Sequence, residues 1–321
     1  MDSDSKSKDA NARGVEAGGA LVVGGGTMGT DIAAVFGASR WRVQIVEPDR
    51  SRWVAASARI ARSVSQLAGP DAVFNPALLA SLADVEWSRL DLVVECVPEQ
   101  LPLKQAVFEQ LETLAPAGLP LASNSSSFPI TSIAARCGTR SRMLGMHFFM
   151  PAHLVPAVEV VRGQDTDPAV CTKCAEILQA LGKVPVNVKK DVPGFLANRL
   201  QHALAREAFS LIDEGFASPE DVDAAVRYGF GFRFLAAGPV LQKDISGIDV
   251  HCAAAATMYP HLANNAEPAR VLRERVASGK LGMKSGEGFY RWTSESAERE
   301  KNRYEKALLQ ALEILKADRS A

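Results

Sequence analysis

Short apolar runs alternate with segments of helical spacing over the first 190 residues of the chain. The runs have the length of buried strands and lie at 20–23, 43–46, 91–96, 119–122, 142–149, 157–161 and 184–188. The segments whose apolar residues follow a helical period lie at 32–36, 49–66, 76–82, 101–115 and 167–182. Strands that alternate with helices predict a parallel, doubly wound sheet whose ligands lie at the carboxyl ends of the strands.

The pattern changes near residue 190, and everything beyond it is typical of helices. The predicted helices are 195–215, 219–228, 248–257, 267–278 and 296–317, and Ser218 and Pro219 have the residue types of a helix cap and first position. We therefore expect an α/β domain over 20–190 and an all-α domain over 191–321. Residues 1–19 are small, polar and charged, and we interpret them as a disordered tail.

The first apolar run ends in a glycine turn that leads directly into a helical pattern. Gly24, Gly26 and Gly29 have the G-x-G-x-x-G spacing, and Thr27 and Met28 stand where the helix begins. Such a turn lets the backbone approach a pyrophosphate, which then meets the N–H groups at the helix N-terminus. We favour a dinucleotide site in a Rossmann-type domain over a plain strand–turn–helix connection.

The next strand ends in Glu47, eighteen residues after Gly29. A carboxylate at that place can accept hydrogen bonds from a ribose diol and repels a 2′-phosphate, so the predicted cofactor is NAD rather than NADP. Arg50 and Arg52 follow closely and could weaken this repulsion, but we expect both to face solvent.

Composition narrows the classes of function. The chain has 321 residues, 47% of them hydrophobic, which suffices for two domain cores, and a formal net charge of -1 gives no basic field for nucleic acid. No apolar run approaches the length of a membrane span, and the first residues lack the apolar centre of a signal peptide. The odd number of cysteines, five, indicates reduced thiols and a cytoplasmic protein.

Cys171 and Cys174 have the spacing of a metal-binding or redox pair. No second Cys/His pair with ligand spacing accompanies them, and Asp167 and Pro168 indicate a helix that starts before both thiols. We predict two ordinary residues on a helix and no metal site.

Two apolar strands flank a loop rich in proline and bring a histidine and a glutamate together. If 142–149 and 157–161 pair as a hairpin centred on residue 153, His147 stands opposite Glu159. In a parallel sheet, Glu99 and the serine-rich segment from Asn124 to Ser127 then lie at the same edge as the glycine turn.

Each of these residues has a structural alternative. His147 could be an ordinary buried histidine, and the other candidate bases are His153, His202, His251 and His261. Ser125 or Ser127 could cap a helix that starts at Pro129, and Lys104 could be a solvated helix charge. Asn198 is a poor helix former inside a good helical pattern, which favours a role in a site.

Taken together, these residues resemble the 3-hydroxyacyl-CoA dehydrogenase family over about 20–292. The motifs that carry the resemblance are GGGTMG at 24–29, CVPE at 96–99, SNSSS at 123–127, HFF at 147–149, PAVEVV at 156–161, DVPGFLANRL at 191–200 and KSGEGFY at 284–290. The resemblance implies oxidation, with NAD, of the 3-hydroxyl of a 3-hydroxyacyl-CoA or related 3-hydroxy acid, a place in fatty acid metabolism, and a homodimer formed through the helical domain.

The resemblance also implies roles for individual residues. His147 would be the general base, Glu159 its orienting partner, and Ser126 and Asn198 the groups that position substrate. Glu47, Glu99 and Lys104 match positions that contact the ribose region of NAD, and Asn124 lies on the cofactor side. This assignment agrees with the chemistry, because oxidation of an alcohol requires a base that accepts the hydroxyl proton.

Three departures from the family leave the substrate open. Met150 stands where the family commonly has asparagine, and the segment 51–66 contains arginines but none of the lysines of CoA-handling relatives. Residues 229–239, which include Arg233, are more similar to relatives that act on free hydroxy acids, such as L-gulonate and carnitine dehydrogenases. In that case Arg233 would bind the substrate carboxylate, whereas its structural alternative is a pairing with a local acid or with solvent.

Two further alternatives are weighed on the same motifs. The 3-hydroxyisobutyrate and phosphogluconate dehydrogenases share the glycine turn but use a lysine base, and the SNSSS and HFF segments argue against them. A non-catalytic NAD-binding protein, like the lens crystallins of this family, is disfavoured because His147 and Glu159 are both present.

Overall fold

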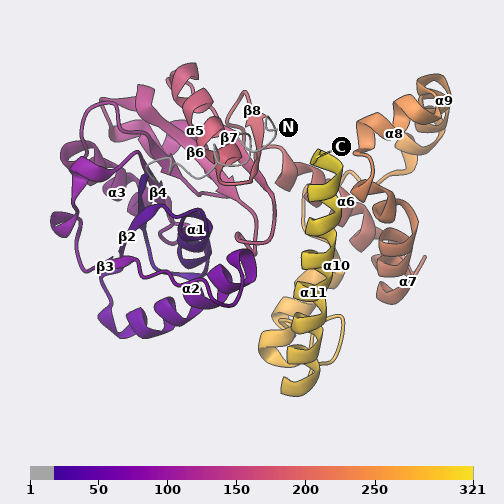
Figure 1. The fold of residues 1–321 in the computed structure, drawn as a ribbon. Helices are drawn as coiled ribbons and strands as arrows, with labels where there is room; N and C mark the ends of the chain where they lie inside the picture. The colour runs from indigo at the N-terminus through magenta and orange to yellow at the C-terminus, as the bar shows by residue number, and fades with distance from the viewer. Residues whose placement is uncertain (1–17, 321) are drawn as a thin grey trace, which may run out of the picture. The chain divides into compact units, whose positions relative to one another are not determined.

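The computed structural model describes residues 18–320, so residues 1–17 of the predicted tail over 1–19 lie outside the described residues. The chain divides into two compact units, one that ends at Leu196 and one that begins at Ala197. All strands of the main sheet belong to the first unit, whereas the second unit is built of helices (Figure 1). The first predicted strand begins one residue earlier than expected, because Gly19 is already part of it.

The first unit contains a single eight-stranded sheet with the order β3-β2-β1-β4-β5-β6-β7-β8. The strands are β1 Gly19–Val23, β2 Arg42–Val46, β3 Ala77–Leu79, β4 Leu92–Glu95, β5 Leu121–Ser123, β6 Met143–Phe148, β7 Ala157–Val161 and β8 Val184–Val188. Neighbouring strands are parallel except β6 and β7, which pair antiparallel. The strand order reverses between β1 and β4, and ligands of doubly wound sheets bind at such a switch point.

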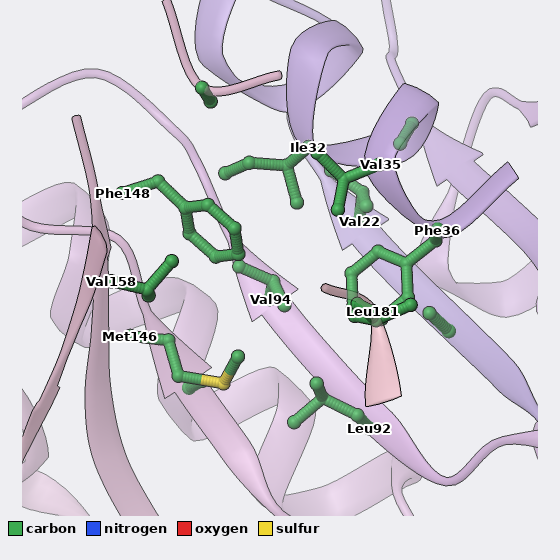
Figure 2. Close-up of a cluster of buried hydrophobic side chains, with 14 of the residues drawn as sticks. Val22, Ile32, Val35, Phe36, Leu92, Val94, Met146, Phe148, Val158 and Leu181 are labelled. Carbon is green, nitrogen blue, oxygen red and sulfur yellow. The ribbon is translucent and has the colours of Figure 1, made fainter. Parts of the chain in front are cut away.

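Helices cover both faces of this sheet because its central strands are apolar on both sides. The helices of the first unit are α1 Thr27–Ala38, α2 Trp53–Ala68, α3 Leu101–Leu114, α4 Ile130–Ile133 and α5 Pro168–Ala180. Alternate β1 residues enter two separate cores: Val22 packs with α1, α2 and α5, and Leu21 packs with α3 and α4. Figure 2 shows the first core, in which Phe148 of β6 points toward Val94 of β4 and Ile32 of α1.

The second unit is helical, as predicted. Its α-helices are α6 Ala197–Asp213, α7 Pro219–Ala224, α8 Pro239–Ser246, α9 Ile248–Met258, α10 Arg270–Ala277 and α11 Ser294–Ser320. Ser218 caps α7 through the backbone N–H of Asp221, as its residue type indicates, and Pro219 occupies the first turn. The helix α8, which begins at a proline after Gly238, was not expected from the sequence.

One local prediction and one structural alternative are wrong. Residues 77–79 form the edge strand β3, which pairs with β2, instead of a helix over 76–82; only 82–84 make a short 3-10 turn. Pairing at a sheet edge here outweighs the weak helical preference of an alanine- and leucine-rich segment. The helix α4 begins after Pro129 without a side-chain cap, and Ser125 and Ser127 bind Glu99 instead.

Within residues 18–320, no helix has both the length and the apolar character that a bilayer crossing requires. Cys171 and Cys174 lie on α5, where Asp167 accepts a hydrogen bond from the N–H of Ala169 and Pro168 is the first residue, as predicted.

Candidate active site

The glycine turn between β1 and α1 has the backbone that a dinucleotide site needs. Gly24 has a φ of +110°, and a side chain there would also come within 2.8 Å of the Cys96 carbonyl oxygen. A Cβ on Gly29 would collide with the carbonyl oxygen of Gly24, whereas the space beside Gly26 is open apart from Arg52. Glycine is therefore required for the turn at 24, for close packing at 29 and for an open approach at 26.

The turn opens into a cavity of about 600 Å³ at the carboxyl ends of β1, β2 and β4. Five of the predicted cofactor residues line it, namely Gly24, Gly26, Thr27, Met28 and Glu47. The backbone N–H groups in the first turn of a helix lack helical partners, so those of α1 would donate to the phosphates of a bound dinucleotide. These residues fit the pyrophosphate and adenosine ribose of NAD.

Glu47 is buried at the end of β2 and is held in a fixed position. Its Oε2 accepts a hydrogen bond from the N–H of Gly25 at 3.0 Å, and its Oε1 accepts one from the N–H of Asp49 at 3.1 Å. Arg52 faces solvent, as expected, but its Nη1 also lies 3.4 Å from the same carboxylate. The two charges therefore share the adenosine end of the cavity.

His147 and Glu159 are brought together by the hairpin of β6 and β7, in the register that the sequence predicts. Nδ1 of His147 lies 2.7 Å from Oε2 of Glu159, and both side chains are almost completely buried. A carboxylate accepts hydrogen bonds but cannot donate them, so the imidazole donates from Nδ1. Nε2 is then left with its lone pair, ready to accept a proton.

Two residues that the sequence analysis did not single out complete this pair. The N–H of Leu196 donates to the second carboxylate oxygen of Glu159 at 3.0 Å. The ring of Phe195 lies 5.7 Å from that of His147, and Phe195 has a φ of +47°, a strained value for a residue other than glycine. The end of the first unit therefore helps to orient both members of the pair.

Glu99 organises the serine-rich loop after β5. Its Oε1 accepts hydrogen bonds from the hydroxyls of Ser125 and Ser127 and from the N–H groups of Ser126 and Ser127. Burial alone would raise the pKa of Glu99, but the two serine hydroxyls and the nearby Lys104 ammonium outweigh it and lower the pKa to about 2. The carboxylate thus fixes the backbone of the loop that presents Ser126.

We expect this arrangement to make stability depend on acid pH. Because the pKa of Glu99 falls from 4.5 to about 2 on folding, the ionised carboxylate adds stability above about pH 4.5, and this contribution is lost as the pH falls towards 2. Glu99→Gln should therefore lose less unfolding free energy than the wild type across that window, measured by urea unfolding. Glu176→Gln on α5 removes an exposed carboxylate and is the control; equal pH profiles for Glu99→Gln and the wild type would contradict this role.

Lys104 is not a solvated helix charge, so that alternative is wrong. Its side chain is 1% exposed, and Nζ lies 2.9 Å from Oε1 of Glu95 and 3.2 Å from Oε2 of Glu99. Glu95, which no sequence pattern indicated, is a fully buried carboxylate that also accepts a hydrogen bond from the Ser123 hydroxyl at 2.6 Å. This buried cluster joins β4, β5 and α3 beneath the cofactor edge of the sheet.

Asn124 ties the ends of β5 and β6 together, since its Oδ1 accepts a hydrogen bond from the N–H of Phe148 at 2.9 Å. This contact is next to His147 in the chain and fixes the end of the strand that carries the base.

The loop between β6 and β7 is held from both sides. Nζ of Lys183 donates to the carbonyl oxygens of Ala152, His153 and Val155 at 2.7–3.2 Å. On the other side, Nε2 of His153 lies 2.7 Å from Oε1 of Gln66. His153, one of the alternative bases, is thus buried and bound to Gln66.

The remaining predicted residues occupy different parts of the chain. Ser126 is exposed on the loop after β5, in the unit that contains His147. Asn198 is half-buried near the start of α6, and Arg233 is exposed in the short helical turn Gly231–Leu235; both belong to the second unit. Their roles toward a substrate stay predictions.

Comparisons with known proteins identify two matching domain families. The NAD-binding domain of 3-hydroxyacyl-CoA dehydrogenase matches residues 19–192, and the C-terminal domain of the same enzyme matches residues 194–292. All of α11 lies beyond the second match, which ends two residues before that helix starts.

The relatives include enzymes named for two kinds of substrate. The chain is 34% identical to a 5-formyl-3-hydroxy-2-methylpyridine 4-carboxylate 5-dehydrogenase of Mesorhizobium japonicum, covering 85% of this chain and 90% of that one. It is 33% identical to a probable 3-hydroxybutyryl-CoA dehydrogenase of Deinococcus radiodurans, and the match covers 84% of this chain and 99% of that protein.

Solved structures give the same two groups. A 5-formyl-3-hydroxy-2-methylpyridine 4-carboxylic acid 5-dehydrogenase, described as an NAD+ dependent dismutase, has a TM-score of 0.88 at 30% identity and covers 93% of this chain and 98% of its own. An (S)-3-hydroxybutyryl-CoA dehydrogenase from Ralstonia eutropha has a TM-score of 0.69 at 30% identity, and the match covers 86% of this chain and 99% of that one.

Proposed function

Because the chain belongs to the 3-hydroxyacyl-CoA dehydrogenase family of NAD-dependent oxidoreductases that act on CH–OH donors, we propose a specific reaction for it. The protein oxidises the 3-hydroxyl of a 3-hydroxyacyl-CoA or a related 3-hydroxy acid to the ketone. The observation that supports this proposal most strongly is the buried His147–Glu159 pair with Nε2 of His147 available.

The residues of the site divide the work of this reaction. NAD, when bound, accepts the two electrons and the hydrogen that leave the carbinol carbon. Nε2 of His147 accepts the hydroxyl proton, and Glu159 holds the proton on Nδ1 and stabilises the imidazolium that forms. Ser126 and Asn198 donate hydrogen bonds to the substrate oxygens. The buried setting between Phe149 and Phe195 keeps water away from the imidazole.

A free carboxylate is the second candidate substrate, and specific observations favour it. Arg59 on α2 is already paired with Asp31 through two hydrogen bonds of 2.9 Å. It is therefore poorly placed to bind the phosphates of CoA. The likeness to the pyridine carboxylate dehydrogenase also covers more of the chain than the likeness to the 3-hydroxybutyryl-CoA dehydrogenase does.

A substrate panel decides between the two classes. NADH formation would be followed with 3-hydroxybutyryl-CoA and longer 3-hydroxyacyl-CoAs, with free 3-hydroxybutyrate, L-gulonate and L-carnitine, and with 5-hydroxymethyl and 5-formyl pyridine carboxylates. We expect efficient turnover within one class only. Absence of turnover with every compound would contradict the proposed function.

Arg233 provides a test that depends on the substrate class. Its side chain is exposed between Phe232 and Phe234, and no ion pair joins it to an acid within the part of the chain that the structure describes. If it binds the substrate carboxylate, Arg233→Met should lower kcat/KM for a free hydroxy acid by about 10²-fold or more and leave 3-hydroxybutyryl-CoA nearly unaffected. Arg273→Met, at an exposed position on α10, is the control.

Activity of the wild type on each substrate class also tests the role of Arg233. If the wild type oxidises the CoA ester efficiently but no free acid, or if both Arg233→Met and Arg273→Met have the same effect, the carboxylate role of Arg233 is wrong.

The second unit supports the proposal of a homodimer. Several large apolar side chains in it are more than two thirds exposed, namely Phe216, Tyr228, Phe232, Val240 and Ile245. A cavity of about 1200 Å³ lies among α6, α7, the 282–292 segment and α11, and apolar side chains such as Phe209, Phe289 and Trp292 line it. Monomers rarely leave so much apolar surface uncovered. Light scattering during gel filtration should give twice the chain mass, and a monomer would contradict the proposal.

The cytoplasm is the proposed compartment, because all five cysteines are free thiols and disulfides are rare in a reducing environment.

A further inference from the structure

Two opposite charges share the adenosine end of the cofactor cavity. Glu47 and Arg52 both line the cavity of about 600 Å³ that contains Gly26. A Cβ added to Gly26 would lie 3.8 Å from Nη2 of Arg52, so the guanidinium reaches the mouth of the glycine turn. The family assignment explains Glu47 as the ribose ligand but gives no role to Arg52.

The segment that carries Arg52 is ordered around Glu47. Asp49 caps the 3-10 turn Arg50–Arg52 by accepting hydrogen bonds from the N–H and the hydroxyl of Ser51. The indole N–H of Trp53 donates to the carbonyl oxygen of Glu47 at 2.8 Å. Arg52 is therefore positioned by its backbone even though 54% of its side chain is exposed.

Glu47 suits an adenosine with a free ribose diol, whereas Arg52 suits an adenosine with a 2′-phosphate. A carboxylate accepts hydrogen bonds from the 2′- and 3′-hydroxyls of a ribose and repels a 2′-phosphate. A guanidinium matches the geometry and charge of a phosphate through two parallel N–H groups. With Glu47 present, Arg52 is neutralised by it; a 2′-phosphate would compete with Glu47 for the same guanidinium.

We infer that Arg52, held beside Glu47 over the glycine turn, is the residue through which this site also accepts a 2′-phosphorylated adenosine, so that NADP is a second, weaker cofactor. The balance between the two cofactors is then set by the pair: Glu47 favours NAD, and Arg52 limits how strongly NADP is rejected. This inference concerns cofactor binding and does not depend on which substrate is oxidised.

Arg50 supplies a matched control. It lies two residues before Arg52 in the same turn, but its guanidinium sits 5.4 Å from the centroid of the Trp53 ring, and it does not line the cavity. Arg50→Gln therefore removes the same charge from the same neighbourhood without removing a group that faces the cofactor.

The test uses binding of cofactor fragments to the protein without substrate. ADP-ribose and 2′-phospho-ADP-ribose would be titrated calorimetrically into the wild type, Glu47→Gln, Arg52→Gln, Arg50→Gln and the Glu47→Gln/Arg52→Gln double variant. Glu47→Gln should bind the 2′-phosphorylated fragment about tenfold more tightly than the wild type does. Arg52→Gln should weaken that fragment about tenfold and change ADP-ribose binding by less than about threefold.

The double variant decides the question. In the double variant, the tighter binding of the 2′-phosphorylated fragment that Glu47→Gln produces should disappear. Arg50→Gln should change binding of either fragment by less than about threefold. ADP-ribose binding by each variant shows that its site is folded. The inference is overturned if the double variant keeps the gain, if Glu47→Gln binds ADP-ribose but not the 2′-phosphorylated fragment, or if Arg50→Gln and Arg52→Gln act alike. A failed substrate panel with successful fragment titrations would contradict the proposed function alone.

Discussion

His147→Ala is expected to lower kcat by about 10²–10⁴-fold, the usual contribution of a general base. The variant loses the imidazole that Glu159 holds, and the two aromatic rings beside it, Phe149 and Phe195, carry no basic group. ADP-ribose binding should barely change, because the cofactor cavity does not include His147. Steady-state kinetics and calorimetric titration together test this expectation.

Glu159→Gln provides the complementary test. An amide can accept one of the two hydrogen bonds that the carboxylate accepts, from His147 and from the N–H of Leu196, but it does not stabilise an imidazolium. Turnover should fall while the variant remains folded. His261→Ala, at an exposed position in the second unit, is the control. Normal turnover by His147→Ala would show that another group is the base.

Lys104→Met is expected to be the most destabilising single substitution considered, at about 3–5 kcal/mol of unfolding free energy. The methionine fills much of the same space, but the fully buried Glu95 carboxylate then loses its ammonium partner at 2.9 Å. Removal of one member of a buried pair leaves an uncompensated charge in the protein interior. Urea unfolding at neutral pH measures the difference.

The control for Lys104→Met is Lys173→Met on α5, an exposed position where the change should cost less than about 0.5 kcal/mol. Glu95→Gln combined with Lys104→Met should recover part of the lost stability, because the buried charge is then absent. Similar stabilities for Lys104→Met and Lys173→Met would contradict the buried pairing.

The elements with strong local signals could be predicted from the sequence. The glycine turn, the two helix starts at Asp167 and Ser218, and the alternation of strands and helices each depend on residues that are close together in the chain. The pairing of His147 with Glu159 could also be predicted, because both lie at equal distances from the centre of a short hairpin loop. In each case the chain itself limits the geometry.

Features that depend on distant contacts could not be predicted in this way. Lys104 has the same local pattern as an exposed helix lysine, and only the packing of α3 against β4 places it beside Glu95. The edge strand β3 exists because β2 offers it free hydrogen-bonding groups. Likewise the positive φ of Phe195 comes from the junction that it occupies, and no residue preference indicates it.

The identity of the hydrogen that is transferred tests the central claim most directly. A 3-hydroxybutyryl-CoA, 3-hydroxybutyrate or hydroxymethyl pyridine carboxylate that the panel shows to be a substrate would be prepared with deuterium on its carbinol carbon and incubated with the wild-type protein and NAD. We expect the deuterium to be recovered in NADH, and we expect His147→Ala to lower the rate by at least about 10²-fold. NADH that carries no deuterium, or a His147→Ala rate equal to that of the wild type, would contradict it.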